Sequence, residues 1–169
     1  KFQRIIAQKQ EADVKFLIQQ ANLRNSEWKS EDVKNLLAAI QEVNAAVNKE
    51  ITSIEVAGYA SPDGGENLNT KLATKRQENT QKKLQRELKK IKVTTTVDSE
   101  ITAEDWAYFQ ALVEASNIQG KKDILSILKN EADPEKREKK IKDLGVVYEE
   151  LATAILPELR RSRLILNYN

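Results

Sequence analysis

The sequence contains no cysteine, no histidine and no methionine. Without thiolates or imidazoles it can build neither a Cys/His metal site nor a Ser-His-Asp or Cys-His nucleophile, and it has no disulfide framework. Paired carboxylates such as Glu149 and Glu150 are adjacent in sequence and diverge on a helix, which argues against acid–base catalysis. We therefore expect no cofactor, no metal and no enzymatic activity.

Long apolar runs and a strong net charge are also missing. No run approaches the ~20 residues that a membrane-spanning helix needs, so we expect no membrane insertion by this segment. Lys and Arg number 28 against 26 for Asp and Glu, which gives little attraction to nucleic acid. A basic stretch over 82–92 is interrupted by acidic residues and has no interleaved aromatic side chains, so we expect no nucleic-acid partner. The chain starts at Lys1 without an apolar signal segment, and we expect it to be a fragment of a longer precursor.

The first half of the chain alternates between strand and helix patterns. A length of 169 residues with 40% hydrophobic residues is enough for a single domain, 1–169, with its own core. Apolar periodicity and cap residues predict strands at 14–18, 54–59 and 93–97 and helices from Ser30 to about 47 and over 67–90. This alternation predicts a βαβαβ core over 12–98, with right-handed crossovers and helices on one face of the sheet.

The second half is predicted to be helical up to the last strand. Thr102 and Asp105 have the spacing of a capping box before Trp106, and Asp133 precedes a proline at a first helical position. We expect a helical insertion over 100–158, with Trp106 in its core, and a last strand within 159–168. The fold class is thus α/β (α+β), a sheet with helices on one face plus an extended helical insertion.

Three features are candidates for a site. The loop over 58–65 follows a strand at the carboxyl end where open α/β sheets bind ligands, although it has no phosphate-binding fingerprint and an ordinary turn is the alternative. Arg76 lies beside the apolar side of the next helix, where its guanidinium could hold a carboxylate bidentately or simply reach solvent. The basic cluster over 160–163, directly before the last strand, is the third candidate, and the alternative is that it is an ordinary solvated basic surface.

The segment over 55–84 resembles the signature of outer-membrane protein A-like domains. Those domains have a strand ending in Gly-x-Thr-Asp, a glycine-bearing loop, and then Asn-x-x-Leu-Ser-x-x-Arg-Ala-x-x-Val-x-x-x-Leu. The corresponding positions here are Gly58-Tyr59-Ala60-Ser61 and then Asn69, Leu72, Ala73, Arg76, Thr80 and Leu84. Leu159-Arg160-Arg161 is similar to the family's Asn-Arg-Arg before its final strand. The resemblance covers residues 12–98 and 159–168, and the helical stretch between them is longer than in the family.

The resemblance implies a non-catalytic module of the bacterial cell envelope. In the family, an aspartate and the helix arginine clasp the amino-carboxylate end of diaminopimelate in the peptidoglycan peptide stem. The resemblance thus implies a periplasmic domain, part of or attached to an outer-membrane-associated protein, that anchors it to the cell wall. The ligand contacts that it implies are Gln19, Tyr59, Ser61, Asn69, Arg76 and Arg160.

Ser61 stands where the family has its aspartate. A hydroxyl cannot replace a carboxylate facing an ammonium group, and a charged hydrogen bond is worth about 1.5 to 3 kcal/mol. Because Pro62 favours an extended Ser61, and residues two apart in an extended chain point the same way, Asp63 is the candidate for the missing carboxylate. The alternative is a domain that keeps the fold, has lost the ligand, and serves as a structural or protein-interaction module among other envelope proteins.

Overall fold

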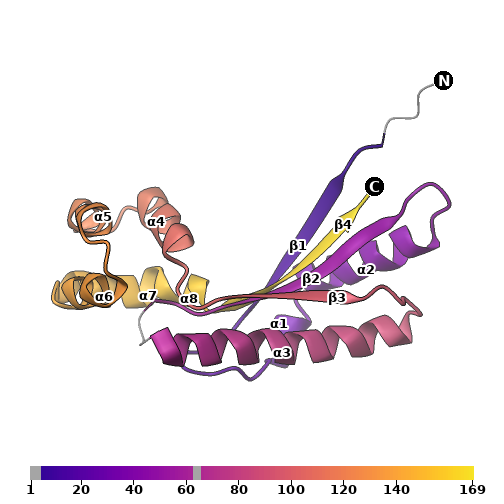
Figure 1. Ribbon diagram of the computed structural model, residues 1–169, viewed down its shortest axis with the longest axis horizontal. Helices are drawn as coiled ribbons and strands as arrows, with labels where there is room; N and C mark the ends of the chain where they lie inside the picture. The colour runs from indigo at the N-terminus through magenta and orange to yellow at the C-terminus, as the bar shows by residue number, and fades with distance from the viewer. Residues whose placement is uncertain (1–4, 63–65) are drawn as a thin grey trace.

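The computed structural model describes residues 5–62 and 66–169, in which a mixed sheet is combined with helices (Figure 1). This confirms the predicted α/β (α+β) class. In chain order the elements are β1 (Gln8–Lys15), α1 (Asn25–Trp28), α2 (Glu31–Ala45), β2 (Ile51–Tyr59), α3 (Glu66–Lys90), β3 (Val97–Thr102), α4 (Trp106–Ala115), α5 (Lys121–Asn130), α6 (Pro134–Lys142), α7 (Val146–Ala154), α8 (Leu156–Leu159) and β4 (Arg161–Tyr168).

The last strand occupies the interior of the sheet. The strand order is β1-β4-β2-β3, and β4 runs antiparallel to both of its neighbours. β1 and β2 therefore run in the same direction with β4 between them, while β2 and β3 pair directly in parallel. The two crossover connections carry α2 and α3, so the sheet cannot be completed until the C-terminal strand arrives.

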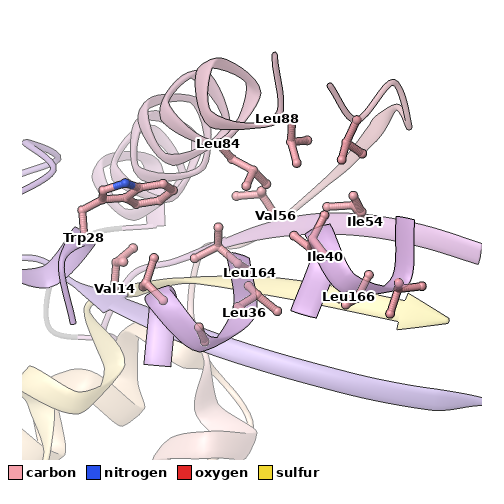
Figure 2. Packing of buried hydrophobic residues seen from close by; sticks show 14 of the residues in the cluster. Val14, Trp28, Leu36, Ile40, Ile54, Val56, Leu84, Leu88, Leu164 and Leu166 are labelled. Atoms are coloured by element: carbon pink, nitrogen blue, oxygen red, sulfur yellow. The ribbon is translucent and has the colours of Figure 1, made fainter. Parts of the chain in front are cut away.

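The main core lies between the sheet and helices α2 and α3 (Figure 2). Ser30 begins α2 as predicted, because its Oγ accepts a hydrogen bond from the N–H of Val33 at 3.4 Å. Burying one large aliphatic side chain contributes roughly 1.5 to 3 kcal/mol relative to exposure. The buried side chains that face one another in this layer include Val14, Leu36, Ile40, Ile54, Val56, Leu84, Leu88, Leu164 and Leu166.

Helix α3 contacts β2 closely at Gly58. A Cβ atom built on Gly58 would lie 2.2 Å from the carbonyl oxygen of Ala73 and 2.7 Å from Cβ of Gln77. On the neighbouring strand, Ser162 pairs with Gly58 and its hydroxyl donates to the carbonyl oxygen of Arg76 at 2.9 Å. Small residues on β2, β4 and α3 thus let the helix backbone reach the sheet, and this contact fixes the position of Arg76.

The helices α4 to α8 form a second apolar cluster at the end of the sheet opposite the start of β1 and the end of β4 (Figure 1). Asp133 begins α6, where its carboxylate accepts from the N–H of Glu135, as predicted. The predicted helical stretch before the last strand is thus present, and its core is Phe109, Val113, Ile118, Ile124, Ile141, Leu151, Ile155, Leu156 and Leu159.

Two predicted strands lie elsewhere in the structure. β1 ends at Lys15, and Leu17 and Ile18, which we expected to continue it, are 47% and 56% exposed. The burial of β1 follows a period of two, with Ala12 and Val14 facing inward. The residues that alternate with them are polar or charged, and for this reason the sequence did not reveal the strand. β3 begins at Val97, where the prediction had it end, because Val93 is buried in the turn after α3 and donates its N–H to the carbonyl of Leu88.

Two predicted helix boundaries also moved. Asp105, and not Thr102, begins α4, since its carboxylate accepts from the N–H of Tyr108 at 3.3 Å. Helix α2 ends at Ala45, and Val47 is fully exposed although the apolar periodicity had placed it on the buried face. Helix α2 thus ends earlier than the apolar pattern predicted, and α4 begins later than the expected cap at Thr102.

Gly58→Ala should lower the free energy of unfolding by about 1 to 3 kcal/mol, the usual cost of overpacking a filled interior. The added methyl group would meet the backbone of α3, which moves less readily than a side chain. Chemical denaturation of both proteins measures the difference. An unchanged midpoint would mean that α3 can move away from β2 without loss.

Truncating a side chain of helices α4 to α8, the helical unit, should lower the stability more the more deeply that side chain is buried. Phe109 is 1% exposed, whereas Trp106 is only partly buried and packs with its ring edge-on to Phe109 at 5.5 Å. We expect Phe109→Ala to reach the upper part of the roughly 3 to 5 kcal/mol range for aromatic truncation, and Trp106→Ala the lower part. Val146→Ala, at a side chain 78% exposed, is the control and should change thermal unfolding little. Equal unfolding of all three variants and the parent would contradict this placement of the core.

Candidate functional site

A small cavity lies at the carboxyl end of β2, between the loop after β1, the start of α3 and the residue before β4. Its volume is about 20 Å³, which is room for about one water molecule. Five of the seven predicted contact residues line it together with three apolar side chains: Gln19, Ser61, Asn69, Arg76 and Arg160, with Ile18, Leu68 and Leu72. Chain segments more than 50 residues apart therefore converge here, as Arg76 and Gln20 show.

Arg76 is the most enclosed charge of the cavity, with 1% of its surface exposed. Its Nε donates to the carbonyl oxygen of Gln20 at 2.9 Å, Nη1 to that of Tyr59 at 3.0 Å and Nη2 to that of Leu17 at 3.3 Å. The guanidinium carbon also lies 5.4 Å from the centroid of the Phe16 ring. Arg76 thus ties the loop after β1 to the end of β2, a structural role that the sequence did not predict.

The loop after β1 is held to α3 by a second side chain as well. Asn79 lies one turn after Arg76 on α3, and its amide donates to the carbonyl oxygen of Ala21 at 2.7 Å. Within the loop, Gln19 has a φ of +54°, a left-handed conformation that is uncommon for a residue with a side chain. This turn places the carbonyl groups of Leu17 and Gln20 so that both accept from the same guanidinium.

The charged side chains among the described walls of the cavity are Arg76 and Arg160. Ser61, Asn69 and Arg160 are buried, at 3%, 2% and 8% exposure, and Arg160 with Arg76 supplies two guanidinium groups. Among the described residues that line the cavity there is no carboxylate. Asp63, the predicted source of one, lies outside the described residues.

Tyr59 takes part in a different site from the one predicted. Its carbonyl oxygen accepts from Arg76, but its ring lies on the opposite side of the sheet, where Arg161 stacks on it with 4.0 Å between Cζ and the ring centroid. Tyr108 of α4 lies on the guanidinium too, at 4.2 Å. The structure thus brings the Tyr59 side chain to Arg161 and not to the cavity.

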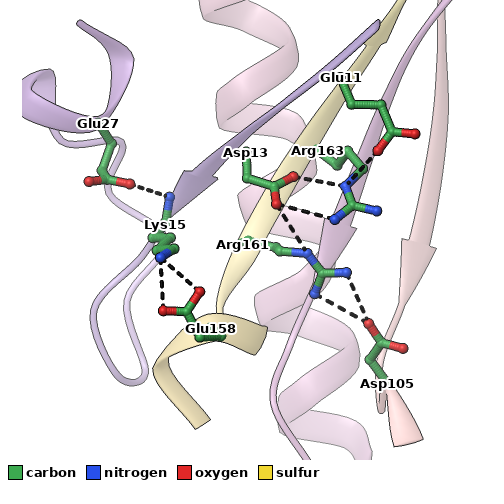
Figure 3. Close-up of polar contacts among 8 residues, drawn as sticks. All are labelled: Glu11, Asp13, Lys15, Glu27, Asp105, Glu158, Arg161 and Arg163. Atoms are coloured by element: carbon green, nitrogen blue, oxygen red, sulfur yellow. Dashed lines mark hydrogen bonds and ion pairs between the residues drawn. The ribbon is translucent and has the colours of Figure 1, made fainter. Parts of the chain in front are cut away.

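Arg161 connects the sheet with the helical unit (Figure 3). Nη1 and Nη2 of Arg161 both donate to Oδ2 of Asp105, at 3.3 and 3.2 Å, and only 2% of Arg161 is exposed. Since Asp105 also caps α4, one carboxylate fixes the start of that helix and neutralises the buried guanidinium. This arrangement holds the first helix of the insertion against the end of β2 and the start of β4.

A ladder of charges continues along the same face (Figure 3). Arg163 pairs bidentately with Asp13 on β1, at 2.8 and 3.2 Å, and this hydrogen bonding raises the pKa of Arg163 above its ordinary value. At the end of β1, Lys15 donates to Glu158 of α8 at 2.9 Å, and this contact raises the pKa of Lys15. Side chains from β1, β4 and α8 are thus cross-linked by ion pairs.

The alternative of a solvated basic cluster over 160–163 is wrong. Arg160 and Arg161 are buried, and Arg163 is paired and partly buried. The alternation of Arg161 and Arg163 was a sign that both lie on one face of a strand. Their partners could not be found from the sequence, because the register of β1 against β4 brings Asp13 to Arg163, 150 positions away, and the packing of α4 brings Asp105 to Arg161, 56 positions away.

Other kinds of site find no support in the described part of the chain. Within residues 5–62 and 66–169, no group of three or more acidic, histidine or cysteine side chains is placed to hold a metal ion. Over the same ranges, no helix has both the length and the apolar character needed to cross a bilayer. In comparisons with known proteins, no family model and no curated sequence matches the chain.

The phenol of Tyr59 should ionise at a higher pH than a free tyrosine, because burial raises its pKa above 10.0. In the unfolded chain the phenol releases its proton first, so this group makes the folded state less stable as the pH rises above about 10. An ultraviolet titration should show a late phenol that Tyr59→Phe removes and Tyr148→Phe leaves in place. A late phenol that persists in Tyr59→Phe would show that another tyrosine is responsible.

Proposed function

We propose that this chain is a non-catalytic module of the bacterial cell envelope that binds the amino-carboxylate end of a peptidoglycan stem peptide and so anchors a larger envelope protein. The observation that carries the proposal is the convergence of Gln19, Ser61, Asn69, Arg76 and Arg160 on one cavity. These are the positions that the resemblance to outer-membrane protein A-like domains implies. A periplasmic location follows from the same proposal.

The charge of the cavity supports recognition of a carboxylate. Two guanidinium groups border it, and a guanidinium is suited to planar, bidentate contact with a carboxylate. Asn69 supplies a buried amide on α3 at the same wall. The ammonium group of the ligand would meet the neutral hydroxyl of Ser61, so the expected affinity is low.

The cavity has to open for such a ligand. At about 20 Å³ it is smaller than an amino-acid end group, and its walls must separate before one enters. The loop after β1 is one such wall, and there Gln19 and Ile18 are exposed. Opening that wall would break contacts between Arg76 and the loop carbonyls, which is a second reason to expect weak binding.

A second candidate function is supported by these same contacts. Arg76 donates to three backbone carbonyls and is 1% exposed, as in a residue whose task is to hold the fold together. On this reading the domain retains the architecture, has no peptidoglycan ligand, and acts as a structural or protein-interaction module in the envelope. The two candidates predict different results when a carboxylate is added at position 61: the anchor should then bind the stem peptide more tightly, and the interaction module should not bind it.

Ser61→Asp should strengthen binding of a diaminopimelate-containing muropeptide by about 1 to 2 kcal/mol, or roughly five- to thirtyfold. The new carboxylate would stand beside Arg76 and Arg160 and would face the ligand's ammonium group. Titration calorimetry of the parent and the variant against one muropeptide measures the gain. The gain should shrink at high salt as the exposed part of the interaction is screened.

The matched control is Ser61→Asn, which has the shape of aspartate without its charge and should bind no better than the parent. Arg76→Ala is a poor test, because it would leave three carbonyl groups without their donor and lower stability. Gln19→Gly is not a clean test either, because it removes one predicted contact and at the same time relieves the strain of the positive φ at that position. No heat from the parent and no gain from Ser61→Asp would favour the interaction module over the anchor.

A further inference from the structure

A basic groove runs along the C-terminal half of α3 on the side of β3. We define it by the residues that line it: Lys82, Gln85, Arg86, Leu88, Lys89, Val93, Thr95, Thr96 and Val97. Its volume is about 680 Å³, far larger than the cavity at Arg76. Lys82, Arg86 and Lys89 follow one another at helical spacing on one face of α3 and are all exposed.

Within the part of the chain that the structure describes, the cations of the groove have no carboxylate partner. Among the described residues, no acidic side chain lies within ion-pair distance of Lys82, Arg86 or Lys89. Elsewhere the molecule pairs its charges, as in the ladder formed by Asp13 with Arg163. A second hollow, which Lys83 and Asn79 also line, continues from Lys82 and Arg86 across α3. The positive surface is therefore continuous and available to an external anion.

The groove adjoins an open edge of the sheet. β3 is the last strand in the order, and in Figure 1 its outer side is followed by no further strand of the described chain. The carbonyl of Thr102 faces β2, since it accepts from the N–H of Ala60. Because backbone groups of successive residues in a strand point to opposite sides, those of Ser99 and Ile101 point away from β2. An added strand could pair with them.

We propose that the basic groove and the free edge of β3 together form a docking site for an acidic protein segment in extended conformation, independent of the Arg76 cavity. The segment would add a strand to β3 and place every second side chain toward α3. Carboxylates at these positions would meet Lys82, Arg86 and Lys89. The apolar side chains of Leu88 and Val93 at the base exclude water from part of the contact.

The shape and composition of the site favour a protein segment over other polyanions. Single-stranded nucleic acid is bound largely through aromatic side chains on which its bases stack, and no aromatic residue lines the groove. An anionic membrane is a flat surface that fits a convex basic face, whereas here the cations border a hollow beside an unpaired strand. Backbone pairing along β3 would be used only by another polypeptide.

The test uses a fluorescein-labelled octapeptide of alternating Glu and Thr, which is acidic and favours an extended chain. Fluorescence anisotropy should show salt-sensitive binding to the whole chain. The double variant Lys82→Glu/Arg86→Glu should weaken this binding about tenfold, as expected for reversing two exposed charges at the contact. The control Lys34→Glu/Lys122→Glu makes the same change of net charge at exposed positions on α2 and α5 and should leave the affinity unchanged.

Ser99→Pro tests the strand addition separately. It removes an N–H that points to the open edge and spares the pairing with β2, so binding should fall about threefold to tenfold while Ser99→Ala binds like the parent. The same octapeptide with Lys in place of Glu should not bind. Absence of binding at millimolar peptide, or binding that neither the charge reversal nor Ser99→Pro alters, would overturn the proposal. So would equal or tighter binding of an oligothymidylate or of phosphatidylglycerol vesicles that Lys82→Glu/Arg86→Glu abolishes.

Discussion

The structure depends on one buried charge, the guanidinium of Arg76. A charge out of contact with water is costly unless each of its donors finds an acceptor, and here carbonyl groups of Leu17, Gln20 and Tyr59 fill that role. To meet them, α3 must touch β2, which only the missing side chain at Gly58 allows. The loop after β1 must also turn toward the helix. One electrostatic requirement therefore sets the helix–sheet distance, the path of the loop and the shape of the cavity.

A second buried guanidinium, that of Arg161, holds the helices α4 to α8 to the sheet. Arg161 lies between the rings of Tyr59 and Tyr108 and is neutralised by Asp105, which also begins α4. The sheet and the insertion are thereby joined through polar contacts at α4, and Lys15 with Glu158 joins them again at α8, while each has its own apolar cluster. This division explains why so long an insertion is accommodated between β3 and β4: it needs to match the sheet only at its first helix and at α8.

The two proposed binding sites differ in how much the fold already uses them. The cations at the cavity are buried and help to hold loops and strands in place, so a ligand there competes with the fold itself. The cations of the basic groove are exposed and make no ion pair among the described residues, so a ligand there competes only with water and salt. Binding at the cavity should thus be limited by opening, and binding at the groove by screening.

Local patterns in the sequence determined α2, α3, β2 and the helical character of the insertion, because periodicity and caps such as Ser30 and Asp133 act within a few residues. The polar residues that line the cavity were singled out by the resemblance to outer-membrane protein A-like domains, and of these residues only Asn69 and Arg76 lie on α3. Only the tertiary structure decided where β1 and β3 lie, that Arg76 binds backbone carbonyls, and that Arg161 and Arg163 meet Asp105 and Asp13. Those outcomes depend on strand register and on which acceptors a buried charge reaches, and both are set by contacts between segments far apart in the chain.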